Sequence, residues 1–179
     1  MRVLAVTLLF AGALTTAPLF GQQPPTPPVE STSTAPPAPP TPPLPTPAQT
    51  RYLQGLRTAG RGVAQIKDGL NRLARAQAGH DTLQTRLAGK RLGGLCGAAR
   101  GFLSSGRNSM EPTSYEAPLR KPARDLTLQV DSLSLIAKEC QLTAGKTPSP
   151  IAAGVLTRIR AYEAALAAFR TAIGLPNKQ

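Results

Sequence analysis

The sequence predicts an all-α protein in which a small up-down four-helix bundle follows a signal peptide and a proline-rich, disordered linker. After residue 49, apolar residues recur at helical spacing in four segments, and none of these segments alternates like a strand. The chain lacks Trp and has only 4% aromatic residues, so its core must be largely aliphatic, which suits a helical bundle. Most of its 19 prolines lie before residue 49. We therefore expect a signal peptide over 1–21, a linker over 22–48 and a helical domain over 49–179.

The N-terminal segment has the pattern of a secretory signal. Arg2 precedes an apolar run that continues through small residues and threonines to Phe20, and we expect cleavage near Gly21. The alternative is an uncleaved anchor, because this run is just long enough to span a bilayer. The sequence therefore predicts an exported protein, periplasmic or secreted, or held to the membrane by its N-terminus.

The linker combines Pro with Thr, Ser and Ala and shows no hydrophobic periodicity, which is typical of a polyproline II segment. One interpretation is a stalk that carries the domain away from a membrane or through a cell-wall layer. The alternatives are a passive leader and a docking site for proline-binding modules.

The first predicted helix runs from about Thr50 to Ala78 and ends at Gly79. Its expected inward stripe consists of Leu53, Leu56, Gly60, Val63, Ile66, Leu70, Leu73 and Gln77. A separate face aligns four arginines with one acid, by the rule of about 100° per residue: Arg57, Arg61, Asp68, Arg72 and Arg75. This face is the best candidate for an electrostatic contact surface, and the alternative is an ordinary solvated helix face.

The second predicted helix, from about Asp81 to Ser105, has a glycine at every fourth position: Gly89, Gly93, Gly97 and Gly101. Each glycine costs about 0.8 to 1 kcal/mol relative to alanine, so packing must offset the loss. The first interpretation is close packing against a neighbouring helix. The alternative is a smooth floor that receives an anion between the cationic side chains of Arg86, Lys90 and Arg100.

An irregular connector of about 15 residues is expected over 107–121, because it contains Pro112, Pro118 and scattered polar residues. The third helix is predicted to begin at Lys121 or Pro122 and to end near Leu142, with an inward stripe of Leu126, Val130, Leu133, Ala137 and Cys140. The fourth is predicted to begin at the Ser149–Pro150 pair and to close at Gly174.

Cys96 and Cys140 are the only cysteines, and both point toward the predicted core from different helices. In an exported chain this pattern predicts a disulfide, which would join the second helix to the third. Counted from the connector, the two positions differ in height by about 12 Å, so the helices must be offset for the bond to form. The alternative is two separate buried thiols.

Catalytic constellations are missing from the sequence. His80 is the only histidine and lies at a helix boundary, and the acidic residues form no close pair on one face. Gly145, Lys146 and Thr147 resemble the end of a phosphate-binding loop. However, such a loop requires a glycine at the position that Cys140 occupies, and no strand precedes these residues. We therefore expect no enzyme, no cofactor and no metal site.

The formal net charge of +12 favours polyanionic partners. The tyrosines are too dispersed for a base-stacking platform, which argues against sequence-specific nucleic-acid binding. We expect a non-enzymatic exported module of the cell envelope that binds an anionic polymer or a membrane surface through a basic helix face. The alternative is a structural or adaptor protein that binds other envelope proteins through its glycine groove or its proline-rich segment.

Overall fold

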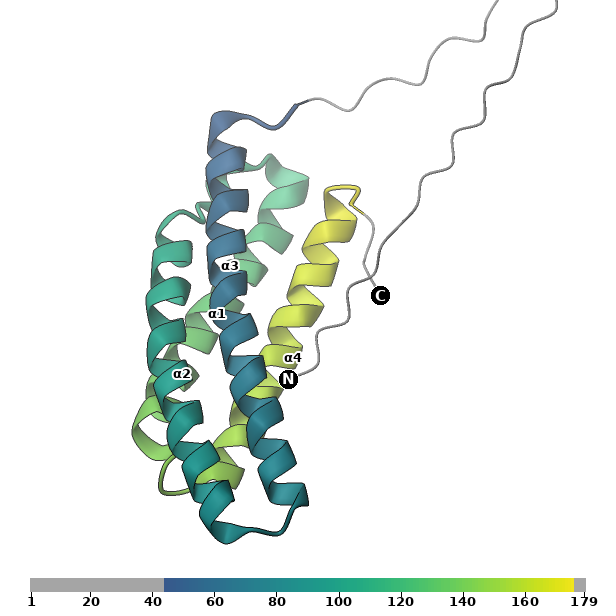
Figure 1. The fold of residues 1–179 in the computed structure, drawn as a ribbon. Helices are drawn as coiled ribbons and strands as arrows, with labels where there is room; N and C mark the ends of the chain where they lie inside the picture. The colour runs from purple at the N-terminus through teal and green to yellow at the C-terminus, as the bar shows by residue number, and fades with distance from the viewer. Residues whose placement is uncertain (1–43, 176–179) are drawn as a thin grey trace, which may run out of the picture. The chain divides into compact units, whose positions relative to one another are not determined.

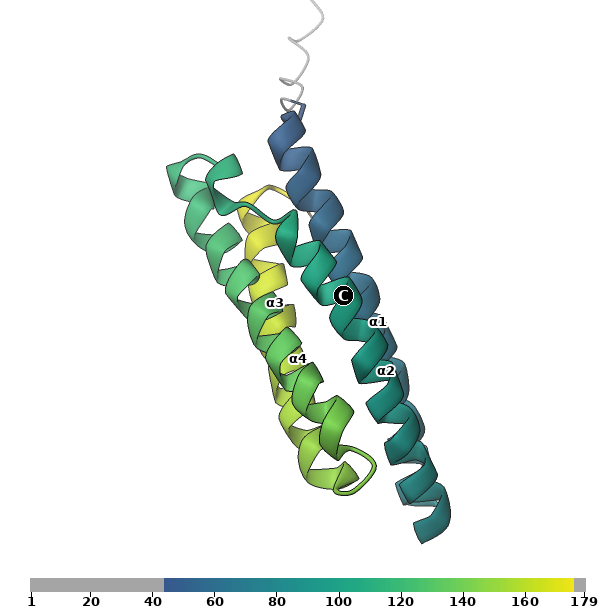
Figure 2. The ribbon, with the colours of Figure 1, turned by 90° about the vertical axis from the view of Figure 1, so that its left-hand side faces the viewer.

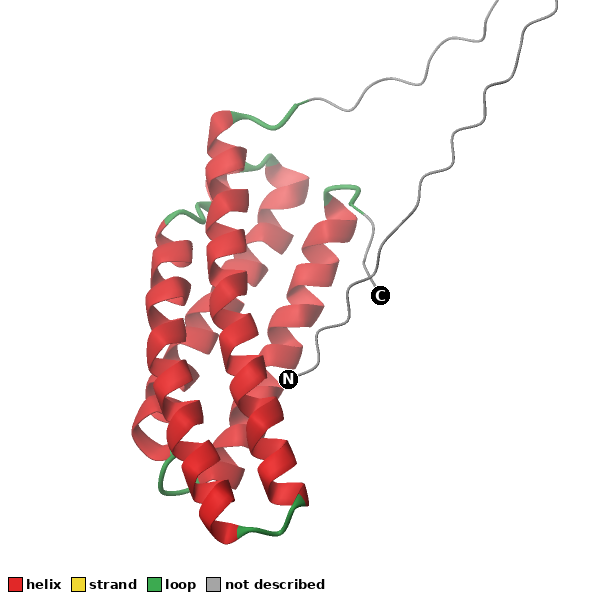
Figure 3. Ribbon diagram, in the orientation of Figure 1, coloured by secondary structure: helices red, strands yellow, loops and turns green. Residues whose placement is uncertain are grey.

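The structure, a computed structural model, describes residues 44–175 of the 179-residue chain. These residues form four α-helices, α1 (Pro47–Ala78), α2 (Thr82–Asn108), α3 (Ala117–Thr143) and α4 (Pro148–Ala172), and one short 3-10 helix, η1 (Pro112–Ser114). Figure 3 shows only helices and loops in this part of the chain, so the all-α prediction is confirmed there. The predicted signal peptide and almost all of the predicted linker lie outside the described residues.

Consecutive helices run in opposite directions, so that α1 and α2 form one hairpin and α3 and α4 a second (Figure 1). The view in Figure 2 separates the two hairpins into two layers. Both views show that the α1–α2 hairpin extends beyond the α3–α4 hairpin at the end where the turns 79–81 and 144–147 lie. The two turns therefore sit at the same end of the bundle, at different heights.

Helix α1 begins inside the segment predicted as linker, because a capping box fixes its first turn. The Thr46 hydroxyl accepts a hydrogen bond from the backbone N–H of Gln49 at 3.2 Å, and the Gln49 side chain accepts one from the N–H of Thr46 at 2.9 Å. Pro47 occupies the first helical turn, where its missing N–H costs nothing. The predicted start at residue 50 was therefore about three residues late.

The predicted boundaries around the connector were wrong. Helix α2 continues through Gly106 to Asn108, and α3 begins at Ala117 instead of residue 121 or 122. Pro118 lies in the first turn of α3, where its missing N–H costs nothing, and Pro122 lies inside the helix, where the hydrogen bond to the carbonyl of Pro118 is missing. The connector is therefore residues 109–116, and it is anchored to the core by Met110 and Tyr115, which are buried.

Helices α1 and α2 approach each other closely at small residues. An added Cβ at Gly55 would lie 2.5 Å from the Gly106 carbonyl oxygen, and one at Gly62 would lie 2.9 Å from the Ala99 carbonyl oxygen. An added Cβ at Gly69 would lie 2.8 Å from Cδ1 of Leu92. The contact positions recur every seven residues in both helices, as in an antiparallel coiled coil in which small residues let the backbones approach.

The inward face of α1 differs from the predicted one, because the helix contacts α2 through glycines and alanines. Gly60 has open space around its Cα, and Leu53, Leu56 and Leu70 are only partly buried. The buried positions of α1 are Tyr52, Gly55, Ala59, Gly62, Val63, Ile66, Gly69 and Leu73. The inward face is thus rotated toward the glycines, because a helix that contacts α2 through its backbone must turn its larger side chains aside. In α3, by contrast, every residue of the predicted inward stripe is buried.

Aromatic side chains gather at the other end of the bundle, near the start of α1. The rings of Tyr52, Tyr115 and Phe169 lie 5.1 to 5.4 Å apart, between α1, the connector and α4. The Tyr52 hydroxyl donates to the carbonyl oxygen of Ala123 at 2.7 Å and lies 3.3 Å from the hydroxyl of Thr127. This cluster joins α1 to α3 through a buried polar contact.

Two glycines of α2 test the packing directly. Gly106→Ala is expected to destabilise the protein by about 1 to 3 kcal/mol, because its Cβ would meet backbone atoms of Gly55 and Ala59. Gly101→Ala lies in the same helix with open space around it, and it is expected to add about 1 kcal/mol of stability. Urea unfolding of both variants under non-reducing conditions measures the difference. Equal effects of the two substitutions would contradict the close contact.

Burial raises the pKa of Tyr52 and of Tyr162 to about 12 and also raises the pKa of Tyr115. The folded state therefore holds phenol protons that an unfolded chain loses near pH 10, so this stabilisation is complete below pH 10 and is lost as the pH rises toward 12. Absorbance titration of the folded protein at about 295 nm is expected to place two of the three phenolate steps, those of Tyr52 and Tyr162, at about pH 12. A step near pH 10 with more than a third of the full amplitude would contradict the burial of these two residues, since the chain has 3 tyrosines.

Candidate functional site

The predicted disulfide between Cys96 of α2 and Cys140 of α3 is confirmed. The sulfur atoms are 2.07 Å apart, the Cα atoms are 6.0 Å apart, and both residues are fully buried. Figures 1 and 2 show the required offset of the two helices. Helix α3 begins beyond the end of α2 along the bundle axis, and the connector spans this difference in height. The bond therefore ties the two layers together near the end that carries the turns.

Three of the four regularly spaced glycines of α2 lie against the last turns of α3. An added Cβ at Gly89 would meet the Ala144 carbonyl oxygen, one at Gly93 would lie 3.3 Å from the Gln141 carbonyl oxygen, and one at Gly97 would lie 3.0 Å from Cδ of Gln141. Gly101 takes no part in this contact, because it has open space around it. The glycine groove is thus packed against α3 and is not one continuous open floor, although Gly93 lines, with Gly94, Arg86 and Lys90, a hollow of about 500 Å³.

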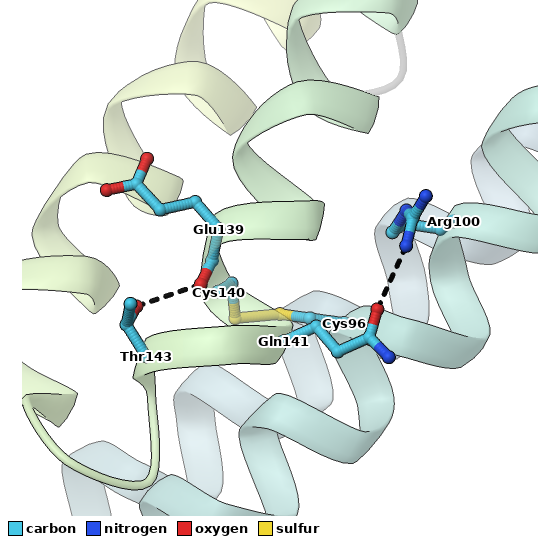
Figure 4. The surroundings of a disulfide bond; sticks show 6 residues. All are labelled: Cys96, Arg100, Glu139, Cys140, Gln141 and Thr143. Atoms are coloured by element: carbon cyan, nitrogen blue, oxygen red, sulfur yellow. Dashed lines mark hydrogen bonds between the residues drawn. A yellow bond between two sulfur atoms is a disulfide. The ribbon is translucent and has the colours of Figure 1, made fainter.

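The three cationic residues expected beside that groove do not form one site. Arg100 donates a hydrogen bond to Oε1 of Gln141 at 3.1 Å, beside the disulfide (Figure 4). Arg86 and Lys90 lie about three to four turns nearer the start of α2 and are exposed. The structure thus separates Arg100, which holds the α2–α3 contact, from Arg86 and Lys90.

The basic face of α1 is exposed along its length. Arg57, Arg61, Arg72 and Arg75 are all exposed, and Arg72 pairs with Asp68 at 2.9 Å within the same helix. Within the described residues, no ion pair involves any of the other three arginines. An anion that approaches this face therefore meets three uncompensated guanidinium groups and one that is already neutralised.

A second basic region lies between the two turns of the bundle. A hollow of about 690 Å³ is lined by residues of both turns and of the first turns of α2 and α4, among them His80, Thr82, Thr85, Arg86, Lys146 and Ser149. An adjoining hollow of about 500 Å³ shares Arg86, Gly145 and Lys146 with the first and adds Lys90. Neither hollow has a carboxylate in its lining.

The sequence pointed to Arg86 and Lys90 but missed Lys146, which was considered only as part of a phosphate-loop pattern. Residues 145–147 belong instead to the connection between α3 and α4. His80, at the boundary between the first two helices, has a positive φ of 54° in the α1–α2 turn and lines the first hollow. The helix cap itself is Asp81, whose Oδ1 accepts hydrogen bonds from the backbone N–H groups of Leu83 and Gln84 at 2.8 and 3.0 Å.

Among residues 44–175, no group of three or more His, Cys, Asp or Glu side chains is placed to hold a metal ion. None of the four helices carries a stretch that is long and apolar enough to cross a bilayer. Comparison of the chain with protein-family models, curated proteins and solved structures gives no match. The candidate sites therefore have to be interpreted from their own chemistry.

Removal of the disulfide is expected to cost about 4 kcal/mol of stability, because the bond closes a loop with a sequence separation of 44. The double variant Cys96→Ala/Cys140→Ala and the reduced wild-type protein should both unfold at lower urea concentration than the oxidised protein. Thiol labelling of the unreduced, denatured chain should detect no free cysteine. An unfolding midpoint that does not change on reduction would contradict this assignment.

Proposed function

We propose that this chain is a non-enzymatic, exported helical module that binds a linear anionic polymer of the cell envelope through the outer face of α1. The observation that carries the proposal is the set of three exposed arginines on that face that have no acidic partner among the described residues: Arg57, Arg61 and Arg75. Guanidinium groups bind sulfate, phosphate and carboxylate through paired hydrogen bonds.

The length of the face suits an extended ligand. At about 1.5 Å per residue, the first and last of these arginines are separated by roughly 27 Å along α1. Individual exposed ion pairs contribute little, about 0 to 1 kcal/mol each, so affinity must come from several contacts made together and must fall with salt. A net charge of +12 adds a long-range attraction for any polyanion.

An anionic membrane surface is the closest competing target. Helices that bind membrane interfaces usually insert aromatic or large apolar residues beside their basic face. In the described part of the chain, the three tyrosines and Phe169 are buried, and the exposed large apolar side chains, among them Leu83, Leu128 and Leu135, lie outside α1. Binding of the α1 face to lipid would therefore rest on charge alone, which favours the polymer.

Export is supported by the disulfide, since such bonds persist in oxidising compartments. The predicted signal peptide and the proline-rich linker complete this part of the proposal: they would deliver the module outside the cytoplasm, and the linker would act as a stalk if the N-terminus remains anchored. The first route of the adaptor alternative, through the glycine groove, is less favoured because Gly89, Gly93 and Gly97 already lie against α3. Its second route, through the proline-rich segment, stays a prediction.

Replacement of the three unpaired arginines tests the proposal. The variant Arg57→Gln/Arg61→Gln/Arg75→Gln is expected to bind dextran sulfate and polyglutamate at least tenfold more weakly at low salt. The dependence of log affinity on log salt should become shallower by about 2 to 3, close to one unit for each arginine replaced. Titration calorimetry at two or more salt concentrations measures both quantities.

The matched control removes the same charge elsewhere. Arg124, Arg158 and Arg160 are exposed on α3 and α4, and their triple glutamine variant should retain most of the affinity. If both triple variants weaken binding equally, the protein responds only to bulk charge and the α1 face is not the site. If the wild-type protein binds vesicles with anionic lipid but neither polymer, a membrane surface is the target.

A further inference from the structure

We infer that the hollows between the two turns form a second, separate anion site that takes a compact ligand with two or more phosphate groups, of the diphosphate type. Its walls are the first turns of α2 on one side and the α3–α4 connection with the start of α4 on the other. The site does not overlap the basic face of α1, and the inference does not depend on the function proposed for that face.

The lining supplies cations and hydrogen-bond donors without acids. Arg86 and Lys146 border both hollows, and Lys90 borders the second. None of these three forms an ion pair within residues 44–175. Thr82 and Thr85 add hydroxyl groups to the first hollow. Three uncompensated cations that converge on a concave surface repel each other, and a multivalent anion relieves that repulsion.

Asp81, the nearest acid in the sequence, forms no ion pair with the three cations of this region. Asp81 directs one carboxylate oxygen to the backbone N–H groups of Leu83 and Gln84, as the cap of α2. Those N–H groups are therefore already satisfied and are not free to hold a ligand. Recognition has to come from side chains, which makes Arg86 and Lys146 the residues that decide affinity.

The two walls are held in place by contacts within and beside the hollows. Gly89 lies directly against the backbone of Ala144, and an added Cβ at Gly145 would lie 3.1 Å from Cγ of Lys90. Gln77 of α1 donates a hydrogen bond to the Ser149 hydroxyl at 2.8 Å, which joins the first hairpin to the second. The disulfide lies about two turns beyond Gly89 along α2. A site fixed in this way loses little entropy when it binds.

The size and charge of the site favour phosphate groups in pairs. The two hollows, of about 690 and 500 Å³, meet at Arg86 and Lys146 and are together larger than one phosphate requires. Arginine binds phosphate through two parallel hydrogen bonds, and lysine binds it as a point charge. The same chemistry occurs in a free diphosphate and in a phosphorylated lipid headgroup, so the experiment has to separate these sources.

Titration calorimetry of the oxidised protein with inorganic pyrophosphate tests the inference. Saturable binding with one site per chain is expected, and the variant Arg86→Gln/Lys90→Gln/Lys146→Gln should bind at least tenfold more weakly. The Arg57→Gln/Arg61→Gln/Arg75→Gln variant and the Arg124→Gln/Arg158→Gln/Arg160→Gln variant carry the same charge change and should bind pyrophosphate as the wild type does. Helical circular dichroism and the unfolding midpoint show whether each variant is folded.

Each alternative outcome has a distinct meaning. No saturable binding of pyrophosphate at millimolar concentration, or equal weakening in all three variants, would overturn the inference. Equal affinity for citrate would overturn the preference for phosphate. If the protein binds pyrophosphate in solution and the Arg86/Lys90/Lys146 variant loses that binding, the site is supported, and vesicles with phosphatidic acid then show whether lipid-borne phosphate reaches it as well. The function proposed for the α1 face is tested by binding of dextran sulfate and polyglutamate instead. A failure of that proposal can therefore be distinguished from a failure of the pyrophosphate site.

Discussion

The architecture depends on the close approach of α1 and α2 at positions that carry almost no side chain. Gly55, Gly62 and Gly69 bring the two backbones together, and each glycine costs about 0.8 to 1 kcal/mol of helix stability relative to alanine. Close contact at three levels, to the backbone of α2 at Gly55 and Gly62 and to the Leu92 side chain at Gly69, offsets that cost through dispersion and through the exclusion of water. Because this contact leaves little room between the helices, the bulky part of the core lies where the first hairpin meets the second.

The second hairpin is bound to the first near both of its ends, by covalent and close-packing contacts at one end and by a hydrogen bond and aromatic contacts at the other. Near the turns, the Cys96–Cys140 bond and the glycines of α2 hold the last turns of α3. At the other end, the Tyr52 hydroxyl donates to the Ala123 carbonyl in an aromatic cluster. Because these two sets of contacts are far apart, they prevent the two hairpins from sliding along each other and from rotating relative to each other. The geometry of the basic hollows is thus a property of the whole bundle, although the residues that line them come from the two turns and the adjoining parts of the helices.

Periodicity and composition were sufficient to predict the helices, the inward face of α3 and the disulfide, because each depends on local spacing or on the compartment. Other features depend on what lies opposite. The four-residue spacing of glycines in α2 can be recognised from the sequence alone. The seven-residue spacing in α1 can be interpreted only when the facing residues of α2 are known: Gly55, Gly62 and Gly69 face Gly106, Ala99 and Leu92. Lys146 and Arg86 are about 60 residues apart in the chain and line the same hollow because the two turns lie at the same end of the bundle. No local sequence pattern could predict that they are neighbours. The start of α3 was misplaced because Pro122 was expected only at a helix start, whereas α3 begins at Ala117 and continues through Pro122 with one backbone hydrogen bond missing.

The register between α1 and α2 also limits how this sequence can change over time. Each step of seven residues down α1 corresponds to seven up α2, so the three contact levels share one alignment. Deletion of a single residue between Gly55 and Gly69 would turn the rest of α1 by about 100° and present large side chains to α2. Length changes are therefore expected to accumulate in the turns and the connector, while the two helices keep their lengths. A larger residue at one level can be accepted only with a smaller one facing it, so these positions should vary in pairs.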